Sequence, residues 1–311
     1  KELGLDIRLA PPHLRHQSAW GVARCALELT RAGRLTDAAG LTPNYHRLSQ
    51  AERERLGKEL LFFDGAMGTM LQQAGLPQGM LPEEWNLARP EVIRDIHRQY
   101  AQAGCQILKT NTFGANREKL ERTGRTVEEI VTAAVTVAKE AAAGRGLVAL
   151  DIGPCGQLLE PTGMLGFEEA VDLFAQVVKA GVQAGADLIA IETMTDLQEA
   201  RAALLAAKEN SSLPVIVTMT YEERGRTFLG CDPASAALTL EGMGADAIGV
   251  NCSLGPREMP PLVRELTRWS TLPIAIKPNA GLPDPGGAGY DITAEEFAGS
   301  MAELTGLGVK L

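Results

Sequence analysis

Two carboxylates in this 311-residue chain stand where a binding site could use them. Asp64 and Glu192 each come directly after a short apolar run, at 60–63 and 188–191. A carboxylate that ends a buried strand points into the space beyond the strand ends, where it can bind a substrate ammonium group. A solvated carboxylate, or a helix N-cap in the case of Asp64, is the simpler alternative. The pair predicts a site for a positively charged amino group.

A thiol is the second reactive group. Cys252 follows the apolar run at 247–250. A free cysteine is often a small buried hydrophobe, but a thiolate is also the nucleophile and metal ligand of protein sites. Cys155 and Cys231 follow two other apolar runs and could join Cys252 at a metal site, whereas Cys105 precedes a run and belongs at the opposite end. The residues alone leave these alternatives open.

Further polar groups follow the apolar runs. Gly65 and Ala66 open a glycine-rich turn whose backbone N–H groups could bind a substrate carboxylate. Asn111 and Thr112 either make turn hydrogen bonds or line a pocket. Asn251 directly precedes the candidate thiol and is placed in the same site.

Other candidates have less defined roles. Asp151 and Lys277 also end apolar runs, and Asp151 could simply hydrogen-bond a neighbouring strand end. Tyr290 and Asp291 precede the last helical segment and could cover the site. His97 lies in a helical segment and is interpreted as a surface or packing residue. No Gly-x-Gly-x-x-Gly or Walker-type loop occurs, so a nucleotide bound by those motifs is not indicated.

A repeated strand–helix pattern positions these residues. Seven apolar runs end in polar residues that lie 26 to 47 residues apart, enough for a crossover helix between parallel strands. The runs lie at 60–63, 107–110, 147–150, 188–191, 215–217, 247–250 and 273–276. Helical periodicity predicts helices at 91–103, 127–143, 168–184 and 197–208.

Seven such units predict an α/β protein with a (β/α)8 TIM barrel rather than an open sheet. In this fold the active site lies at the C-terminal ends of the strands. An eighth strand begins at Gly306 and the sequence stops at Leu311, so the eighth strand and helix are expected to be incomplete.

Residues 1–59 do not follow this pattern, and we expect a separate, short and mostly helical segment before a barrel at 60–311. Within the segment, 26–28 and 41–52 resemble the C-terminal tail of TsaB-like tRNA threonylcarbamoyladenosine biosynthesis proteins. A tail cannot carry that family's function, so the resemblance suggests a fusion.

Three stretches of the barrel carry a more specific resemblance. Residues 62–70, with Asp-Gly-Ala-Met-Gly, 109–116, with Thr-Asn-Thr-Phe-Gly, and 249–256, with Asn-Cys-Ser-Leu-Gly-Pro, resemble the homocysteine S-methyltransferase family. The similarity is greatest to the homocysteine-binding domains of cobalamin-dependent methionine synthases and covers about 60–311. It implies methyl transfer to the thiol of L-homocysteine, giving methionine.

The resemblance also implies a zinc ion held by three cysteines. Cys252 matches one ligand, and the other two form an adjacent pair that belongs just after Leu311, so the printed sequence holds one of the three. Zinc bound by thiolates can take the substrate sulfur as its fourth ligand and deprotonate it. By the same resemblance Asp64 and Glu192 hold the amino group of homocysteine, and Asn111 and Thr112 line its pocket.

The methyl donor implied by the resemblance is methylcobalamin, carried on another domain or protein and recharged from methyltetrahydrofolate. The sequence has no corrinoid-binding Asp-x-His-x-x-Gly motif. Corrinoid- and folate-binding domains or proteins are therefore the expected partners. S-methylmethionine, S-adenosylmethionine or betaine are alternative donors, and a catalytically incomplete fragment without zinc is a third possibility.

The amino-acid composition excludes several classes of protein. There are 30 Lys and Arg against 39 Asp and Glu, a net charge of −9, which argues against non-specific nucleic-acid binding. The five cysteines are odd in number and include no Cys-x-x-Cys pair, which is typical of reduced thiols in the cytoplasm. No long apolar stretch or signal-peptide pattern occurs, so no membrane partner is expected.

Overall fold

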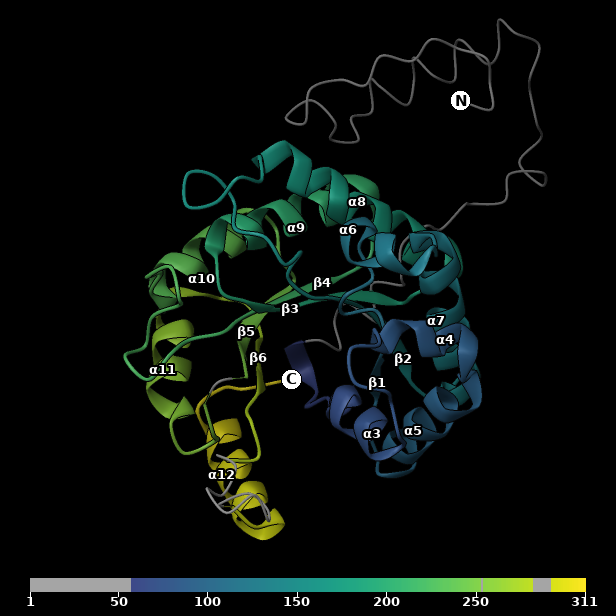
Figure 1. Cartoon of the computed structure of the whole chain (residues 1–311). Coiled ribbons are helices and arrows are strands. Elements are labelled where there is room, and N and C mark those ends of the chain that lie inside the picture. Colours follow the sequence, from purple (N-terminus) through teal and green to yellow (C-terminus); the bar gives the residue numbers. More distant parts are fainter. Residues whose placement is uncertain (1–56, 253, 282–291) are drawn as a thin grey trace, which may run out of the picture. The chain divides into compact units, whose positions relative to one another are not determined.

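The computed structural model of the chain describes residues 57–252, 254–281 and 292–311 (Figure 1). Within them, six parallel strands form one curled sheet, with each strand paired to its neighbours in chain order. The strands are β1 (Ile107–Lys109), β2 (Leu147–Ile152), β3 (Leu188–Met194), β4 (Val215–Met219), β5 (Ala247–Asn251) and β6 (Ile274–Lys277). Nearly all strand residues are buried, which explains their apolar and β-branched character.

Two short segments extend this sheet at its edges. Phe63 bridges Ile107 in parallel beside β1, and Val309 bridges Ile274 in parallel beside β6. The backbone N–H of Leu61 donates to the carbonyl oxygen of Lys310 at 3.0 Å, which joins the two segments. Eight chain segments therefore contribute to the ring, as expected for a TIM barrel.

Helices cover the outer side of the curled sheet (Figure 1). The longer ones are α5 (Pro90–Gln102), α7 (Val127–Ala142), α8 (Phe167–Ala184), α9 (Leu197–Asn210), α10 (Pro233–Gly242), α11 (Met259–Trp269) and α12 (Ala294–Gly306). Shorter ones are α3 (Met67–Gln73), η2 (Pro82–Glu84), α4 (Trp85–Ala88), α6 (Arg117–Leu120) and η3 (Glu121–Thr123). The four helices predicted from periodicity are confirmed to within two residues at each end.

Local sequence explains where several helices begin and end. Thr126 and Glu129 form a capping box at the start of α7, with each side chain accepting from the other's backbone N–H. The Asp196 carboxylate caps α9 in a similar way by accepting from Gln198 N. Gly185 ends α8 at φ 91°, a left-handed conformation that glycine adopts without steric cost.

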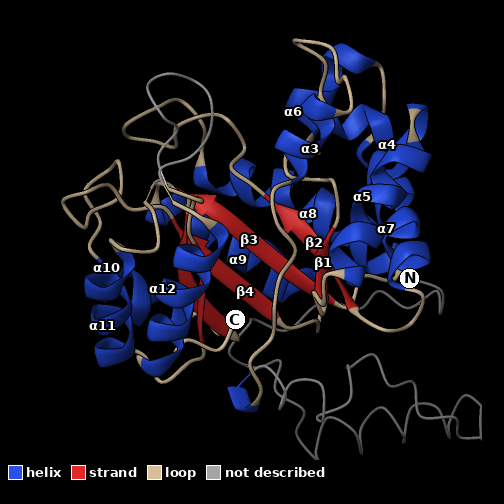
Figure 2. Cartoon of the chain, turned by 90° about the horizontal axis from the view of Figure 1, so that it is seen from below, coloured by secondary structure: helices blue, strands red, loops and turns tan. Residues whose placement is uncertain are grey.

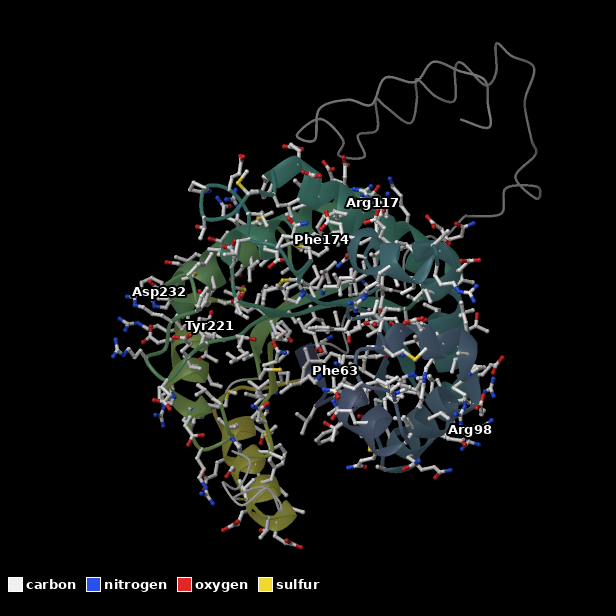
Figure 3. All side chains as sticks on the ribbon, in the orientation of Figure 1. Phe63, Arg98, Arg117, Phe174, Tyr221 and Asp232 are labelled. Carbon is white, nitrogen blue, oxygen red and sulfur yellow. The ribbon has the colours of Figure 1, made fainter. Side chains whose placement is uncertain are left out.

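Two apolar layers hold the barrel together. Between sheet and helices, large side chains such as Phe174 and Tyr221 are fully buried (Figure 3). A second cluster joins the strands to one another and includes four alanines, whose small size suits a narrow barrel interior. Its buried members are Leu61, Ile107, Ala149, Leu188, Ala190, Ile216, Ala247, Ala275 and Leu311.

Leu61 offers a test of this second cluster. Its side chain is 1% exposed, whereas the adjacent Phe62 is 53% exposed. We expect Leu61→Ala to lower the free energy of unfolding by about 2–4 kcal/mol, because truncation removes buried methyl groups and leaves a cavity. Phe62→Ala is the matched control and should cost less than about 1 kcal/mol. Equal losses in urea denaturation would contradict this arrangement of the core.

None of the helices in the described part of the chain is long and apolar enough to cross a membrane. The helices expected within residues 1–56 lie outside the described residues, as do Tyr290 and Asp291. The division of the chain at residue 59 stays a prediction.

Candidate active site

A cavity of about 750 Å³ opens at the C-terminal ends of the strands. In Figure 2 the arrowheads of β2 and β3 point toward the loops on this side of the barrel. Most of the residues expected to form the site line this cavity, namely Gly65, Ala66, Asn111, Glu192, Asn251 and Cys252. Asp64 and Thr112 are buried, at 4% and 1% exposure, and are not wall residues.

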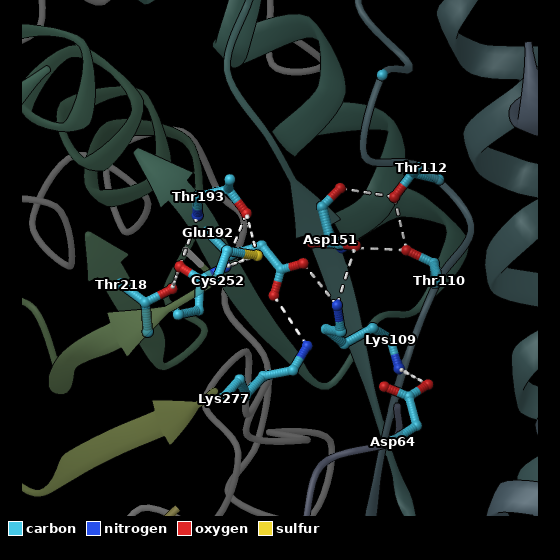
Figure 4. A network of polar contacts seen from close by, with 12 residues as sticks. Asp64, Lys109, Thr110, Thr112, Asp151, Glu192, Thr193, Thr218, Cys252 and Lys277 are labelled. Atoms are coloured by element: carbon cyan, nitrogen blue, oxygen red, sulfur yellow. Dashed lines mark hydrogen bonds and ion pairs between the residues drawn. The ribbon is translucent and has the colours of Figure 1, made fainter. Parts of the chain in front are cut away.

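Four charged side chains follow one another along the cavity wall (Figure 4). Lys109 Nζ lies 3.5 Å from Asp151 Oδ2 and 2.6 Å from Glu192 Oε1. Lys277 Nζ lies 3.1 Å from Glu192 Oε2. The order is therefore Asp151, Lys109, Glu192, Lys277, with negative and positive groups alternating. We call these four residues the charged row.

Burial and mutual attraction set the protonation of the charged row. Burial, and then the charge of Glu192, raise the pKa of Asp151 to about 7. Burial would also raise the pKa of Glu192, but the ammonium groups of Lys109 and Lys277 outweigh it and hold that pKa at about 2. For Lys109, burial opposes the charged form, yet the surrounding carboxylates raise its pKa well above the usual value. The lysines thus favour the ionised form of Glu192, whereas burial disfavours the ionised form of Asp151.

Asp64 lies beneath this wall beside a buried histidine. Its Oδ2 accepts from the backbone N–H of Lys109 at 2.9 Å and lies 3.8 Å from His97 Nδ1, while Oδ1 has no hydrogen-bond partner among the described residues. Burial raises the pKa of Asp64 to about 6 and lowers that of His97 to about 4. His97 is 0% exposed, so its interpretation as a packing residue agrees with the structure, and at neutral pH it is uncharged.

The turn after Asp64 packs closely against Tyr100. A Cβ atom on Gly65 would lie 2.7 Å from the hydroxyl oxygen of Tyr100, which is too close for any real contact. The Tyr100 hydroxyl donates to the carbonyl oxygen of Ala66 at 3.1 Å. This contact ties the turn to α5 and places the backbone of Gly65 and Ala66 on the cavity wall.

Asn251 connects the ends of three strands around Cys252. Its Oδ1 accepts from Thr193 N at 2.9 Å and from Thr218 Oγ1 at 2.8 Å. Its Nδ2 donates to Thr193 Oγ1 at 2.7 Å and to Cys252 Sγ at 3.3 Å. Thr193 and Cys252 both have positive φ, 63° and 59°, which is uncommon for residues with side chains. The Asn251 amide thus fixes a strained pair of strand ends and the direction of the thiol.

The side chains of Asn111 and Thr112 make hydrogen bonds to other parts of the protein. Asn111 Nδ2 donates to the carbonyl oxygen of Pro82 at 2.8 Å and to Asn86 Oδ1 at 3.2 Å. The Thr112 hydroxyl donates to the carbonyl oxygen of Asp151 at 2.7 Å. These contacts tie the loop after β1 to its neighbours, so both side chains hold the shape of the cavity.

Sequence reasoning missed Glu83 and Lys109 on the cavity wall. Glu83 is 3% exposed, its Oε1 accepts from Gly114 N at 2.5 Å, and its Oε2 has no partner among the described residues. Burial raises the pKa of Glu83. Glu83 follows no apolar run, so no pattern indicated it. Lys109 lies inside an apolar run, where a lysine is rare unless it is paired, and this was the available signal.

The described residues do not fit a complete metal site, because no three His, Cys, Asp or Glu side chains among them gather as ligands. Cys252 is a cavity-wall thiol. Burial raises the pKa of the Cys155 thiol to about 12 and that of Cys231 to about 11. Their sulfurs contact the carbonyl oxygens of Gln157 and Asp232 and do not line this cavity. The alternative in which Cys155 or Cys231 completes a site with Cys252 therefore does not hold for this part of the chain.

Two methionine synthases align with most of this chain. Methionine synthase of Mycobacterium leprae is 31% identical over 284 residues, which covers 83% of this chain and 23% of the relative. Methionine synthase of Mycobacterium tuberculosis is 32% identical over 268 residues, which covers 79% and 22%. The chain thus spans less than a quarter of the length of these two relatives.

Solved structures share the fold. The metallated form of the homocysteine methyltransferase MmuM from Escherichia coli superposes with a TM-score of 0.71 at 22% identity, covering 83% of this chain and 92% of MmuM. Its oxidized form gives a TM-score of 0.70. The family model for homocysteine S-methyltransferase matches residues 61–311. The resemblance predicted from the three sequence stretches is confirmed, and the chain belongs to the homocysteine S-methyltransferase family.

Proposed function

We propose that this protein transfers a methyl group to the thiol of L-homocysteine and forms methionine, as the homocysteine-activating part of a cobalamin-dependent methionine synthase. The observation that carries the proposal is the cavity wall. It combines a thiol, Cys252, with paired carboxylates and lysines at the C-terminal ends of the strands. This face of the barrel is where enzymes of this fold work, and such charged groups suit an amino acid with a thiol side chain.

The residues on and beneath the cavity wall also suggest how the substrate is bound. We assign the amino group of homocysteine to the acidic side formed by Glu192, with Asp64 beneath it, and its carboxylate to the side of the Gly65–Ala66 turn. Asn111, Thr112 and Asn251 hold the shape of the pocket through the hydrogen bonds given above. A carboxylate has about four acceptor positions, so Glu192 can accept a further donor although both oxygens already contact lysines.

For zinc, we propose Cys252 as one ligand. The further ligands implied by the family resemblance, an adjacent cysteine pair after the eighth strand, are not in the printed sequence. A zinc ion held by thiolates would lower the pKa of a substrate thiol bound to it. This chain's own contribution is to direct the Cys252 sulfur, which Asn251 Nδ2 contacts at 3.3 Å, onto the cavity wall.

Methylcobalamin is the proposed donor, with corrinoid- and folate-binding domains or proteins as partners. The support is the 31–32% identity to methionine synthases that are more than four times longer than the matched part. S-methylmethionine, S-adenosylmethionine or betaine is the alternative donor. The solved structure of MmuM, itself a homocysteine methyltransferase, shares the fold over 92% of its length, so these donors are tested beside methylcobalamin. A cytoplasmic location stays a prediction from cysteine usage.

A donor panel tests this proposal. The full-length natural protein, supplied with zinc and L-homocysteine, is incubated separately with each of the four donors, and methionine is measured by mass spectrometry. We expect methionine from methylcobalamin. Methionine from S-methylmethionine without cobalamin would favour the alternative donor. No methionine from any donor, together with no bound zinc, would contradict both and support a catalytically incomplete chain.

A further inference from the structure

The loop between β2 and α8 buries two leucines and presents two other apolar side chains to solvent. Leu159 and Leu165 form a short parallel bridge and are each 3% exposed. The residue before each of them is exposed instead, Leu158 at 40% and Met164 at 88%. Met164 is the most exposed large apolar side chain of the described residues. Neighbouring exposed apolar side chains are typical of a surface that binds another protein. We call Leu158 and Met164 the apolar tip.

Hydrogen bonds within the loop hold the apolar tip in place. The backbone N–H of Glu160 donates to the carbonyl oxygen of Leu165 at 2.9 Å, and that of Leu165 donates to the carbonyl oxygen of Leu158 at 3.3 Å. The two sides of the loop lie so close that a Cβ atom on Gly163 would be 2.0 Å from the carbonyl oxygen of Leu158. A surface that is already formed loses little conformational entropy when a partner binds, which favours association.

The loop is attached to the wall of the cavity. Lys119 Nζ donates to the carbonyl oxygen of Pro154 at 2.7 Å, and the Gln157 amide donates to the Glu118 carboxylate. Lys119 and Glu118 both belong to α6 and line the cavity. The apolar tip therefore lies beside the mouth of the cavity, and a protein that binds the tip is brought to that mouth.

The segment that holds the loop is basic. Residues 117–125 contain four Arg or Lys and two Asp or Glu, in a chain whose net charge is −9. Arg117 (Figure 3) and Arg122 are exposed, and Arg122 also lines the cavity. Positive charges at the border of an apolar surface attract a partner with acidic groups and speed its encounter. The partner that fits this surface therefore has an apolar face with acidic side chains at its border.

The methyl donor has to arrive from the same side. The interior of the barrel is filled by the buried cluster that includes Leu61 and Leu311, so the cavity wall with Cys252 is reached from the mouth. The methionine synthases that align with this chain are more than four times as long as the matched part. That length leaves room for a module that carries the donor to the mouth.

We propose that the apolar tip, with Arg117 and Arg122 beside it, is the surface on which the corrinoid-carrying module docks during methyl transfer. This inference rests on the proposed function and names the part of the barrel that receives the donor. The docked module covers Leu158 and Met164 with an apolar face and places acidic side chains near the two arginines. A small free donor such as S-methylmethionine reaches the cavity without this surface.

Met164→Glu in the full-length natural protein tests the proposal. Methyl transfer from bound methylcobalamin to homocysteine is followed in a single turnover by the absorbance of the corrinoid. We expect the rate to fall about 10–100-fold, because a carboxylate replaces an apolar contact and repels an acidic partner. The Kd for homocysteine, by calorimetry, and the methylation of the corrinoid by methyltetrahydrofolate should each stay within about twofold of wild type, since neither uses the docked state. Met164→Leu should restore the transfer rate.

Leu238→Glu is the matched control. Leu238 is 56% exposed, lies on α10 and does not line the cavity, so the same charge placed there should leave all three measurements unchanged. Arg117→Glu tests the charged border. It should slow the transfer about 3–10-fold at low ionic strength, and the effect should shrink above about 0.5 M salt, because salt screens exposed charges.

The outcomes distinguish this inference from the proposed function. A wild-type transfer rate in Met164→Glu would overturn the docking surface and leave the function intact. Equal slowing by Leu238→Glu, or a weakened Kd for homocysteine in Met164→Glu, would overturn it as well, because the effect would not be specific to docking. Methionine formed by wild type from S-methylmethionine alone, and none from methylcobalamin, would overturn the docking surface and keep methyl transfer to homocysteine. No methionine from any donor would overturn the proposed function itself.

Discussion

Replacing Cys252 by alanine is expected to remove bound zinc and to lower methionine formation at least about 100-fold in the full-length natural protein. Loss of partners that merely orient a metal ligand already costs about 10–100-fold in metal affinity or activity, so loss of a ligand should cost at least as much. Among the residues expected to form the site, Cys252 provides the cavity-wall thiol. Zinc content by mass spectrometry and methionine formation are measured on the same samples.

Cys105→Ala is the control for this experiment. Cys105 is also a partly exposed free thiol, but it lies two residues before β1 and does not line the cavity. We expect it to keep both zinc and activity. A Cys252→Ala protein that retained a full equivalent of zinc and normal methionine formation would remove the basis for the proposed metal site.

Replacing Lys109 by methionine is expected to lower the free energy of unfolding by about 3–5 kcal/mol at pH 8, the usual result of breaking a buried ion pair from one side. Lys109 is buried and contacts both Asp151 and Glu192. Methionine keeps most of the side-chain volume, so the loss reports mainly the missing charge. Urea denaturation of both proteins measures the difference.

The loss should depend on pH. Without Lys109, the pKa values of Asp64 and Asp151 rise above their present values of about 6 and 7, because the lysine charge now lowers both. A carboxyl group whose pKa is higher in the folded than in the unfolded protein takes up a proton on folding. The free energy of unfolding therefore falls as the pH rises between two values. The lower value is the pKa of the group in the unfolded protein, about 4, and the upper value is its pKa in the folded protein. The difference between variant and wild type should be smaller at pH 5.5 than at pH 8.

Lys139→Met is the matched control for Lys109. Lys139 Nζ lies 2.6 Å from Asp187 Oδ1, the same separation as in the Lys109–Glu192 pair, but its side chain is 38% exposed. Solvent screens such a pair, so its loss should cost less than about 1 kcal/mol and vary little with pH. Equal costs for the two substitutions would show that burial does not strengthen the charged row.

The fold could be predicted from the sequence because its signals are local. The run at 188–191 is apolar along its length, as a strand covered on both faces requires, and it became β3 (Leu188–Met194). The periodicity at 127–143 became α7 (Val127–Ala142), with the Thr126–Glu129 capping box at its start. Each signal lies within a few residues, and parallel strands must be joined by crossover segments of the observed lengths.

The location of the site could also be predicted. Parallel strands in a barrel bring all their C-terminal ends to one face, so Asn111, Glu192, Asn251 and Cys252 had to lie near one another. Their identities are set by the sequence, and their common face follows from topology alone. All four of these residues line the cavity.

The sequence alone therefore determined the barrel and which of its faces holds the reactive groups. Only the tertiary structure decided how the charges pair. Lys109 contacts Glu192 across 83 positions and Asp151 across 42, and Lys277 contacts Glu192 across 85. Such pairing depends on strand register, side-chain length and burial together, and these are not encoded in any short pattern. The same reason explains why Asp64 and Thr112 lie behind the wall while Glu83 lies on it.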